Sequence, residues 1–89
     1  MHIEFLKTFL EVAKCGSVSK VAEQIGISQP SLSRQLRVLE DEVGLKLLVR
    51  RHRGMKLTPA GAAFRRKIMR VVGQLDRAME EMRTYPPRV

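Results

Sequence analysis

Residues 17–44 carry the pattern of two short helices joined by a sharp turn. In the first helix, apolar residues recur every three or four positions and would face a core: Val18, Val21, Ala22 and Ile25. Gly26 follows directly, and because glycine tolerates a positive φ, the chain can leave one helix and begin another within a few residues. Ser28 favours an amino-terminal cap, and Pro30 is tolerated in a first helical turn. The segment therefore predicts a helix-turn-helix unit.

The second helix of this unit has an apolar and a polar face. Its apolar residues lie four, three and four positions apart and predict the buried face: Leu32, Leu36, Leu39 and Val43. A turn of about 100° per residue places another set away from that face or at the exposed amino end: Gln29, Pro30, Ser31, Ser33, Arg34 and Arg37. Gln, Ser and Arg at the start of a helix can hydrogen-bond to base edges in the major groove of B-DNA. The same residue types also occur on helices that simply face water.

Acidic residues end this polar face. Glu40, Asp41 and Glu42 would repel phosphate, so we expect the helix to leave the groove before them.

A basic segment follows the helix-turn-helix. The chain has 17 Lys and Arg against 9 Asp and Glu, a net charge of +8, as expected of a protein that neutralises a polyanion. Around Gly54, apolar residues alternate in two short stretches, which predicts a β-hairpin: Leu45, Leu47 and Val49, then Met55 and Leu57. The cations expected to bind phosphates or a narrow minor groove are Arg50, Arg51, Arg53 and Lys56. The alternative is a solvated hairpin whose charges protect a sheet edge.

The last segment predicts one long helix over residues 60–84. Thr58 and Pro59 suit its start, and Pro86 and Pro87 end it. At a rise of about 1.5 Å per residue it is about 37 Å long, so much of it would project from a small domain. Its apolar stripe predicts a dimer interface with the same helix of a second copy: Phe64, Ile68, Val71, Val72, Leu75, Met79 and Met82. Alternatively, its amino half, especially Phe64, packs on its own domain and only the later turns meet the partner.

The amino-terminal segment predicts a further helix that completes one small core. Its apolar stripe consists of Ile3, Leu6, Phe9, Leu10 and Ala13. The expected fold is mainly α: a winged helix-turn-helix of three helices and a hairpin wing at residues 1–58, followed by a long dimerisation helix at 59–84 and the start of a hinge at 85–89.

The sequence does not predict catalysis, a metal site or a cofactor. His2 and His52 have no ligand cluster or carboxylate partner suggested by their spacing. Cys15 is the one cysteine, and we expect it to be a small buried residue of a protein in the reducing cytoplasm. No apolar run approaches the roughly 18 residues of a membrane span, and no signal peptide is evident, so we expect no membrane partner.

Together these segments resemble the amino-terminal DNA-binding domain and linker helix of LysR-type transcriptional regulators. The resemblance covers residues 2–83 and rests on three runs in matching order and spacing: Ser-Gln-Pro-Ser-Leu-Ser-Arg-Gln at 28–35, Leu-Glu-Asp-Glu-Val-Gly at 39–44 and Leu-Thr-Pro-Ala-Gly at 57–61. It implies a bacterial transcription factor that dimerises through the long helix and binds interrupted inverted repeats in double-stranded DNA. By position, the family's groove-contacting segment corresponds to Gln29, Pro30, Ser31, Ser33 and Arg34, and its wing tip to Arg53.

Members of that family continue into an effector-binding domain that takes a small-molecule inducer. Residues 85–88 resemble the start of the connecting hinge, so we expect this chain to be the DNA-binding part alone, without inducer sensing.

Two other functions remain open from the residues. A protein-interaction module would pair through the long helix, with salt-insensitive assembly and no DNA affinity. An RNA-binding winged helix would need an aromatic platform for stacking, and the chain has one Tyr and no Trp.

Overall fold

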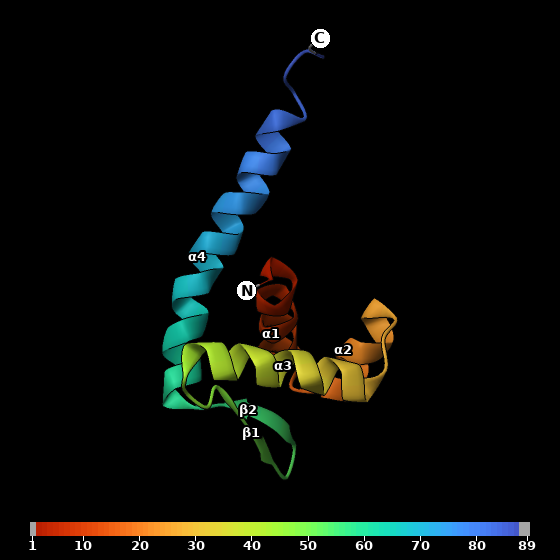
Figure 1. Cartoon of the computed structure of the whole chain (residues 1–89), viewed down its shortest axis with the longest axis vertical. Helices are drawn as coiled ribbons and strands as arrows, with labels where there is room; N and C mark the ends of the chain where they lie inside the picture. The colour runs from red at the N-terminus through yellow and green to blue at the C-terminus, as the bar shows by residue number, and fades with distance from the viewer. Residues whose placement is uncertain (1, 88–89) are drawn as a thin grey trace.

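The computed structural model describes residues 2–87. Its elements are α1 (Ile3–Cys15), α2 (Val18–Ile25), α3 (Gln29–Val43), β1 (Leu48–Arg51), β2 (Gly54–Leu57) and α4 (Pro59–Met82). Figure 1 shows α1, α2, α3 and the hairpin as one body, from which the second half of α4 projects away from the hairpin. This is the mainly α, winged helix-turn-helix arrangement that the sequence predicts. Of the expected hinge, residues 88 and 89 lie outside the described residues.

Capping residues, among them the predicted Ser28 and Thr58, set the starts of three helices. Ser17, Ser28 and Thr58 precede α2, α3 and α4, and each side chain accepts a hydrogen bond from the backbone amide three residues on, at 3.2, 3.1 and 2.9 Å. Gly26 follows α2 with a left-handed backbone, φ 78°, and its N–H donates to the carbonyl of Ala22. The helix-turn-helix therefore follows from local signals.

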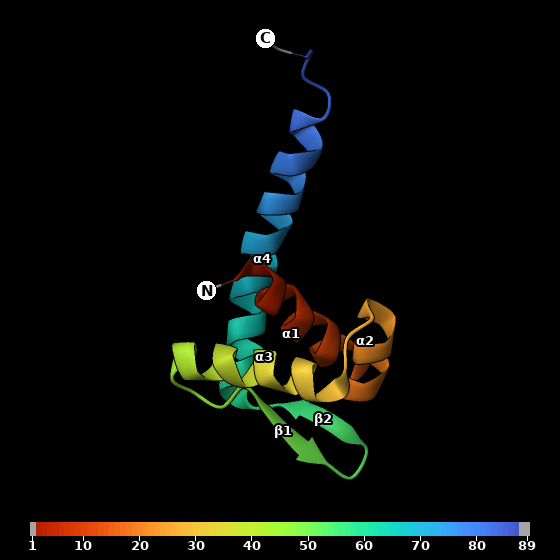
Figure 2. The ribbon, with the colours of Figure 1, turned by 45° about the vertical axis from the view of Figure 1, so that its right-hand side comes forward.

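The core lies between α1, α2, α3, the base of the hairpin and the first half of α4. Its most deeply buried side chains are Phe9, Val12, Val21, Leu32, Leu39 and Leu47. From α4, Ile68 and Val72 join this core, and the ring of Phe64 lies 5.7 Å from that of Phe9 in a tilted pair. Figure 2 shows α1 crossing in front of α4. The amino half of α4 thus packs on its own domain, which is the alternative that the sequence left open.

Two burial predictions at helix ends are wrong. Ile25 is 47% exposed, and Cys15 is exposed as well. Each is the last residue of its helix, where the chain turns away from the neighbouring helices that would cover a side chain. Conversely, Val12 is fully buried although it lies outside the stripe expected for α1.

The alternation predicted for the hairpin is also partly wrong. Leu45 is exposed and Val49 half-buried, whereas Leu47 and Leu48 are both buried. The reason is that β1 begins only at Leu48, so Leu47 belongs to the loop that enters the strand and does not follow its two-residue period. The strands pair antiparallel, with Leu48 opposite Leu57 at the base and Arg51 opposite Gly54 at the tip.

Backbone contacts fix the hairpin at both ends. At the tip, the N–H of Met55 donates to the carbonyl of Gly16 at 3.0 Å, and at the base the N–H of Thr58 donates to the carbonyl of Leu47 at 3.0 Å. Gly54 has φ 105°, and a Cβ there would overlap the carbonyl oxygen of Gly16. Gly61, in the first turn of α4, approaches the carbonyl of Leu47 as closely. The wing is therefore held against α1 and α4.

This close approach predicts that Gly61→Ala is destabilising. The new Cβ would overlap a backbone oxygen that no rotamer change can move, so we expect a loss of about 1 to 3 kcal/mol in the free energy of unfolding. Gly73→Ala, in the same helix but with open space around the new Cβ, should instead stabilise by about 0.5 to 1 kcal/mol. Urea unfolding of both variants measures this, and equal stabilisation by the two would contradict the close packing at Gly61.

Candidate nucleic-acid interface

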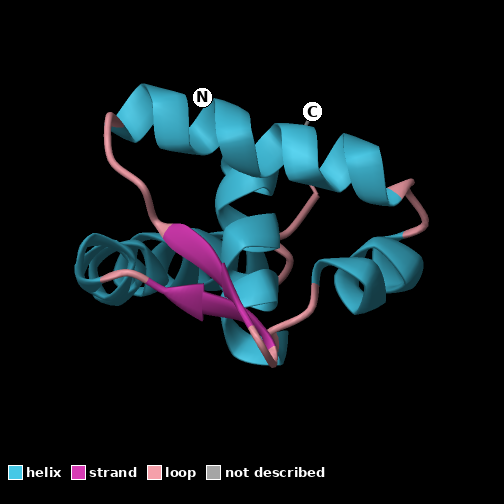
Figure 3. Ribbon diagram, turned by 90° about the horizontal axis from the view of Figure 1, so that it is seen from below, coloured by secondary structure: helices cyan, strands magenta, loops and turns pink. Residues whose placement is uncertain are grey.

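The amino half of α3 and the hairpin share one end of the molecule. Figure 3, a view onto that end, shows α3 running beside the hairpin, with α2 next to the amino end of α3. The projecting half of α4 lies at the opposite end (Figure 1). A flat or cylindrical partner could therefore touch α3 and the hairpin together without meeting α4.

The polar residues predicted at the start of α3 are accessible. Gln29, Pro30, Ser31, Arg34 and Arg37 are exposed, and Ser33 is half-buried. The hydroxyl of Ser31 accepts a hydrogen bond of 2.9 Å from the capping Ser28, which leaves its own proton free to be donated. These side chains lie on two sides of α3, because the helix turns about 100° per residue.

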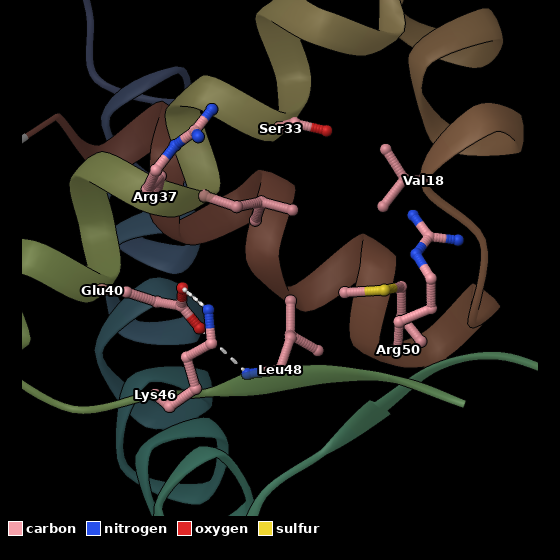
Figure 4. Close-up of a pocket in the computed structure, with 9 residues that line it drawn as sticks. Val18, Ser33, Arg37, Glu40, Lys46, Leu48 and Arg50 are labelled. Atoms are coloured by element: carbon pink, nitrogen blue, oxygen red, sulfur yellow. Dashed lines mark hydrogen bonds and ion pairs between the residues drawn. The ribbon is translucent and has the colours of Figure 1, made fainter.

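One side of α3 faces the hairpin across a groove. Ser33 and Arg37 of α3, Arg50 and Leu48 of β1 and Val18 of α2 line this groove, as Figure 4 shows. A second hollow continues from it toward the wing tip and is lined by Gln29, Arg50, Arg53 and the first residues of α2. The structure thus brings predicted residues of the helix and of the wing together around one concave surface.

Ser31 and Arg34 occupy the other side of α3. They line a shallow hollow with His2, Phe5, Gln35 and Val38. Arg51 and Lys56 lie on the exposed surface of the hairpin strands and line none of these three hollows. The predicted site is therefore a broad surface around α3 and the wing.

The segment between α3 and the middle of α4, which includes the wing, carries charge of one sign. No Asp or Glu occurs between Glu42 and Asp76, a stretch with nine cations: Lys46, Arg50, Arg51, Arg53, Lys56, Arg65, Arg66, Lys67 and Arg70. Within residues 2–87, the predicted contact residues Arg34, Arg37, Arg50, Arg51, Arg53 and Lys56 form no ion pair. Their charges are available to a polyanion. The part of the chain described by the structure has no cluster of His, Cys, Asp or Glu that could hold a metal.

Glu40 has a different role from the one that its charge predicts. Its carboxylate accepts hydrogen bonds from the backbone amides of Leu47 and Leu48, at 2.8 and 3.1 Å, and lies 3.6 Å from the Nζ of Lys46. The sequence pattern predicts only that it repels phosphate. Its position four residues after the buried Leu36 is the available signal for this contact, because it places Glu40 at the edge of the buried face.

Gln35 is a second residue whose contact the sequence does not indicate. The hydroxyl of Thr8, on α1, donates to its Oε1 at 3.3 Å. This bond joins α1 to α3 beside Arg34, and nothing in the sequence pattern pairs these two positions.

Comparison with known proteins identifies the family. A family model described as "Bacterial regulatory helix-turn-helix protein, lysR family" matches residues 3–62. The chain belongs to this lysR family.

Relatives within the lysR family include two named regulators. The HTH-type transcriptional regulator BudR of Klebsiella aerogenes is 40% identical over 83 residues, which are 93% of this chain and 58% of BudR. The regulator TcbR of Pseudomonas sp. strain P51 is 40% identical over 77 residues, 83% of this chain and 26% of TcbR. The chain thus spans from about a quarter to three fifths of the length of these two relatives.

Solved lysR-family structures share the fold over nearly the whole chain. The complex of the CbnR DNA-binding domain with DNA matches with a TM-score of 0.84 and 37% identity, covering 93% of this chain and 95% of that domain. The complex of the BenM DNA-binding domain with catB site 1 DNA has a TM-score of 0.86 and 34% identity, over 93% and 92%. No helix among the described residues is long and apolar enough to cross a membrane.

Proposed function

We propose that this chain binds specific sites in double-stranded DNA as a homodimer. The observation that carries the proposal is the shared surface of α3 and the wing, where exposed cations without ion pairs adjoin Gln and Ser side chains. The BenM and CbnR domains of the same fold and family were solved with DNA. No catalytic step is part of this function.

In this account the amino half of α3 lies in the major groove. Gln29, Ser33 and Arg34 hydrogen-bond to base edges, because Gln suits adenine, Arg suits guanine and Ser suits either. Pro30 and Ser31 contribute contacts at the amino end, and Arg37 lies one turn further along the helix, where it reaches a phosphate. The acidic carboxyl end of α3 is then outside the groove.

The wing holds the flanking DNA. Arg53, in the turn between β1 and β2, enters the adjacent minor groove or clamps its phosphates. Arg50, Arg51 and Lys56 neutralise the backbone on either side, which adds affinity without reading sequence.

The second half of α4 joins the two copies. Three of the predicted interface residues, Phe64, Ile68 and Val72, pack within the chain's own domain, so the proposed interface is reduced to the exposed part of the stripe: Val71, Leu75, Met79 and Met82. Burying four such side chains gains about 6 to 12 kcal/mol per protomer at most. Association costs about 4 to 15 kcal/mol, so the isolated dimer should be concentration-dependent.

We place the action of this chain in the bacterial cytoplasm. The hollows around α3 and the wing adjoin the proposed DNA surface, so we assign no small-molecule inducer to them.

Selection from a pool of random duplexes tests the proposal. We expect the chain to enrich an interrupted inverted repeat, two half-sites with a fixed spacing, because a two-fold dimer presents two copies of α3. Enrichment of no duplex, or of single-stranded RNA in a parallel pool, would reject it.

Mutations should distinguish residues that read bases from residues that bind the DNA backbone. Arg34→Ala should cost roughly 1 to 3 kcal/mol on the enriched duplex and relax the preference at one position of each half-site. Arg53→Ala should weaken binding more evenly across sequences, or mainly lower the preference for an A·T-rich narrow minor groove. Gel-shift titrations against enriched and random duplexes measure both, with Arg77→Ala on α4 as a control. Equal losses on both duplexes for Arg34→Ala would exclude its role in reading bases.

A further inference from the structure

Glu40 ties the wing to α3. Its side chain is only 14% exposed, and one carboxylate oxygen, Oε2, accepts both backbone bonds, from Leu47 at 2.8 Å and Leu48 at 3.1 Å. The other oxygen, Oε1, faces the Nζ of Lys46 at 3.6 Å. Figure 4 shows this side chain reaching from α3 to the start of β1. Among the described residues, it is the side chain of α3 that hydrogen-bonds to the wing.

The other contacts of the hairpin lead to different elements. Met55 at the tip bonds to the backbone of Gly16, between α1 and α2, and Thr58 at the base bonds to Leu47 and to the carbonyl of Lys46. They fix the hairpin against α1 and α4 but not directly against α3. Among the hydrogen bonds of the described residues, those of Glu40 connect α3 directly to β1, beside the apolar packing of Leu48 in the shared core.

We propose that Glu40 is a positioning residue for DNA binding. It holds the wing at the distance and angle from α3 at which both can reach one duplex together. This role rests on the proposed function. A wing already ordered in the free protein loses little conformational freedom on binding, whereas a loose wing would have to be ordered by the DNA and would weaken the complex.

If only its charge mattered, Glu40 would weaken DNA binding. Glu40 lines the groove that also contains Ser33, Arg37 and Arg50, so a carboxylate there repels phosphate. If that were its only effect, removing the charge would strengthen binding and moving the carboxylate would change little. Substitution can separate acceptor from charge, because both backbone bonds end on the same oxygen.

Two substitutions separate the acceptor oxygen of Glu40 from its charge. Glu40→Gln keeps an oxygen acceptor for the two amides and removes the charge, while Glu40→Asp keeps the charge but is one methylene too short to reach them. On the duplex enriched by the wild-type chain, Glu40→Gln should bind at least as tightly as wild type. Glu40→Asp should bind more weakly by about 5- to 150-fold, the range expected when one specific contact with DNA is lost. Asp41→Asn, at the exposed neighbouring acid, is the matched control and should leave affinity within about twofold of wild type.

A double-mutant cycle with Arg53→Ala identifies the wing as the intermediary. In the Glu40→Gln background, Arg53→Ala should lower the affinity by the same factor as in the wild-type chain. In the Glu40→Asp background this factor should shrink to about twofold or less, because a misplaced wing tip already touches little of the DNA. Hydrogen exchange of the Leu47 and Leu48 amides in the free protein should speed up in Glu40→Asp and not in Glu40→Gln. Circular dichroism should show the helices of both variants intact.

Three binding results would overturn this role. They are wild-type affinity of Glu40→Asp, an undiminished effect of Arg53→Ala in that background, or a loss of affinity in Glu40→Gln equal to that in Glu40→Asp. Unfolding of Glu40→Asp with Glu40→Gln folded would also contradict it, because the carboxylate would then support the whole domain. If the wild-type chain enriched no duplex, both the proposed function and this role would be rejected. If the wild-type chain enriched a duplex and the Glu40 variants gave one of the results above, only the role of Glu40 would be rejected.

Discussion

Raising the salt concentration from 50 to 200 mM should weaken duplex binding by about 10³- to 10⁵-fold, if the dimer neutralises about six to ten phosphates. Cations on α3 and the wing that form no ion pair within residues 2–87 would each displace counterions from the DNA. The logarithm of the binding constant should therefore fall linearly with the logarithm of the salt concentration. Fluorescence anisotropy titrations on the enriched duplex at several salt concentrations give this slope.

Paired arginine substitutions provide the control for the salt response. Replacing Arg50 and Arg51 of the wing by Gln should reduce the slope by about 0.9 for each phosphate that is no longer neutralised. Replacing Arg66 and Arg70 of α4, which removes the same charge from an exposed helix face outside the proposed interface, should leave the slope nearly unchanged. A flat salt response of the wild-type chain would favour a protein-interaction module over a DNA-binding domain.

Leu75→Glu should separate the dimer and leave the winged helix-turn-helix folded. Leu75 is 38% exposed and follows Val72, the last residue of α4 in the core, so a charge there removes apolar contact with the partner without entering the domain. Two like charges would also meet near the two-fold axis. Because a second half-site adds about 10² to 10⁴ in affinity through effective concentration, binding to the two-half-site duplex should fall by about that factor.

Three measurements follow this variant. Sedimentation should show monomers, circular dichroism should show most of the helicity, and binding should approach that of a single half-site. Gln74→Glu adds the same charge about 100° around the helix and should leave the dimer intact. A Leu75→Glu protein that stays dimeric and binds the full site with undiminished affinity would mean that α4 meets a different partner.

Local signals in the sequence determine most of this fold. Ser28 and Thr58 each form the predicted cap, and the repeat from Leu32 to Leu39 is buried as predicted. These signals involve residues only a few positions apart, so a single sequence contains them. The predicted burial of Ile25 is wrong, because a periodic pattern does not specify which turns of a short helix the neighbouring elements cover.

The apolar stripe of α4 shows that periodicity does not predict which of its residues pack within the chain's own core. Its apolar repeat continues without a break, yet Ile68 and Val72 are buried in the chain's own core while Met79 and Met82 are exposed. The repeat defines a face, and only the arrangement of α1 against α4 determines where intramolecular cover ends.

In the candidate site, too, the sequence predicts some features and not others. The exposure of Gln29 and Arg34 follows from their place on α3, whereas the bonds of Glu40 to Leu47 and Leu48 join residues seven and eight positions apart through a loop. Because Glu40 lies in α3 while Leu47 and Leu48 lie beyond the end of that helix, neither the helical nor the strand period relates them. That the predicted residues contact DNA stays a prediction.

Backbone amide NMR spectra of the chain, recorded during titration with the enriched duplex, test the central claim most directly. We predict that the largest chemical-shift changes fall in residues 28–37 and 50–56, the amino half of α3 and the wing, and that the exposed face of α4 around Arg66 and Arg70 changes little. Changes concentrated on that face of α4, with α3 and the wing unaffected, would contradict the proposed interface.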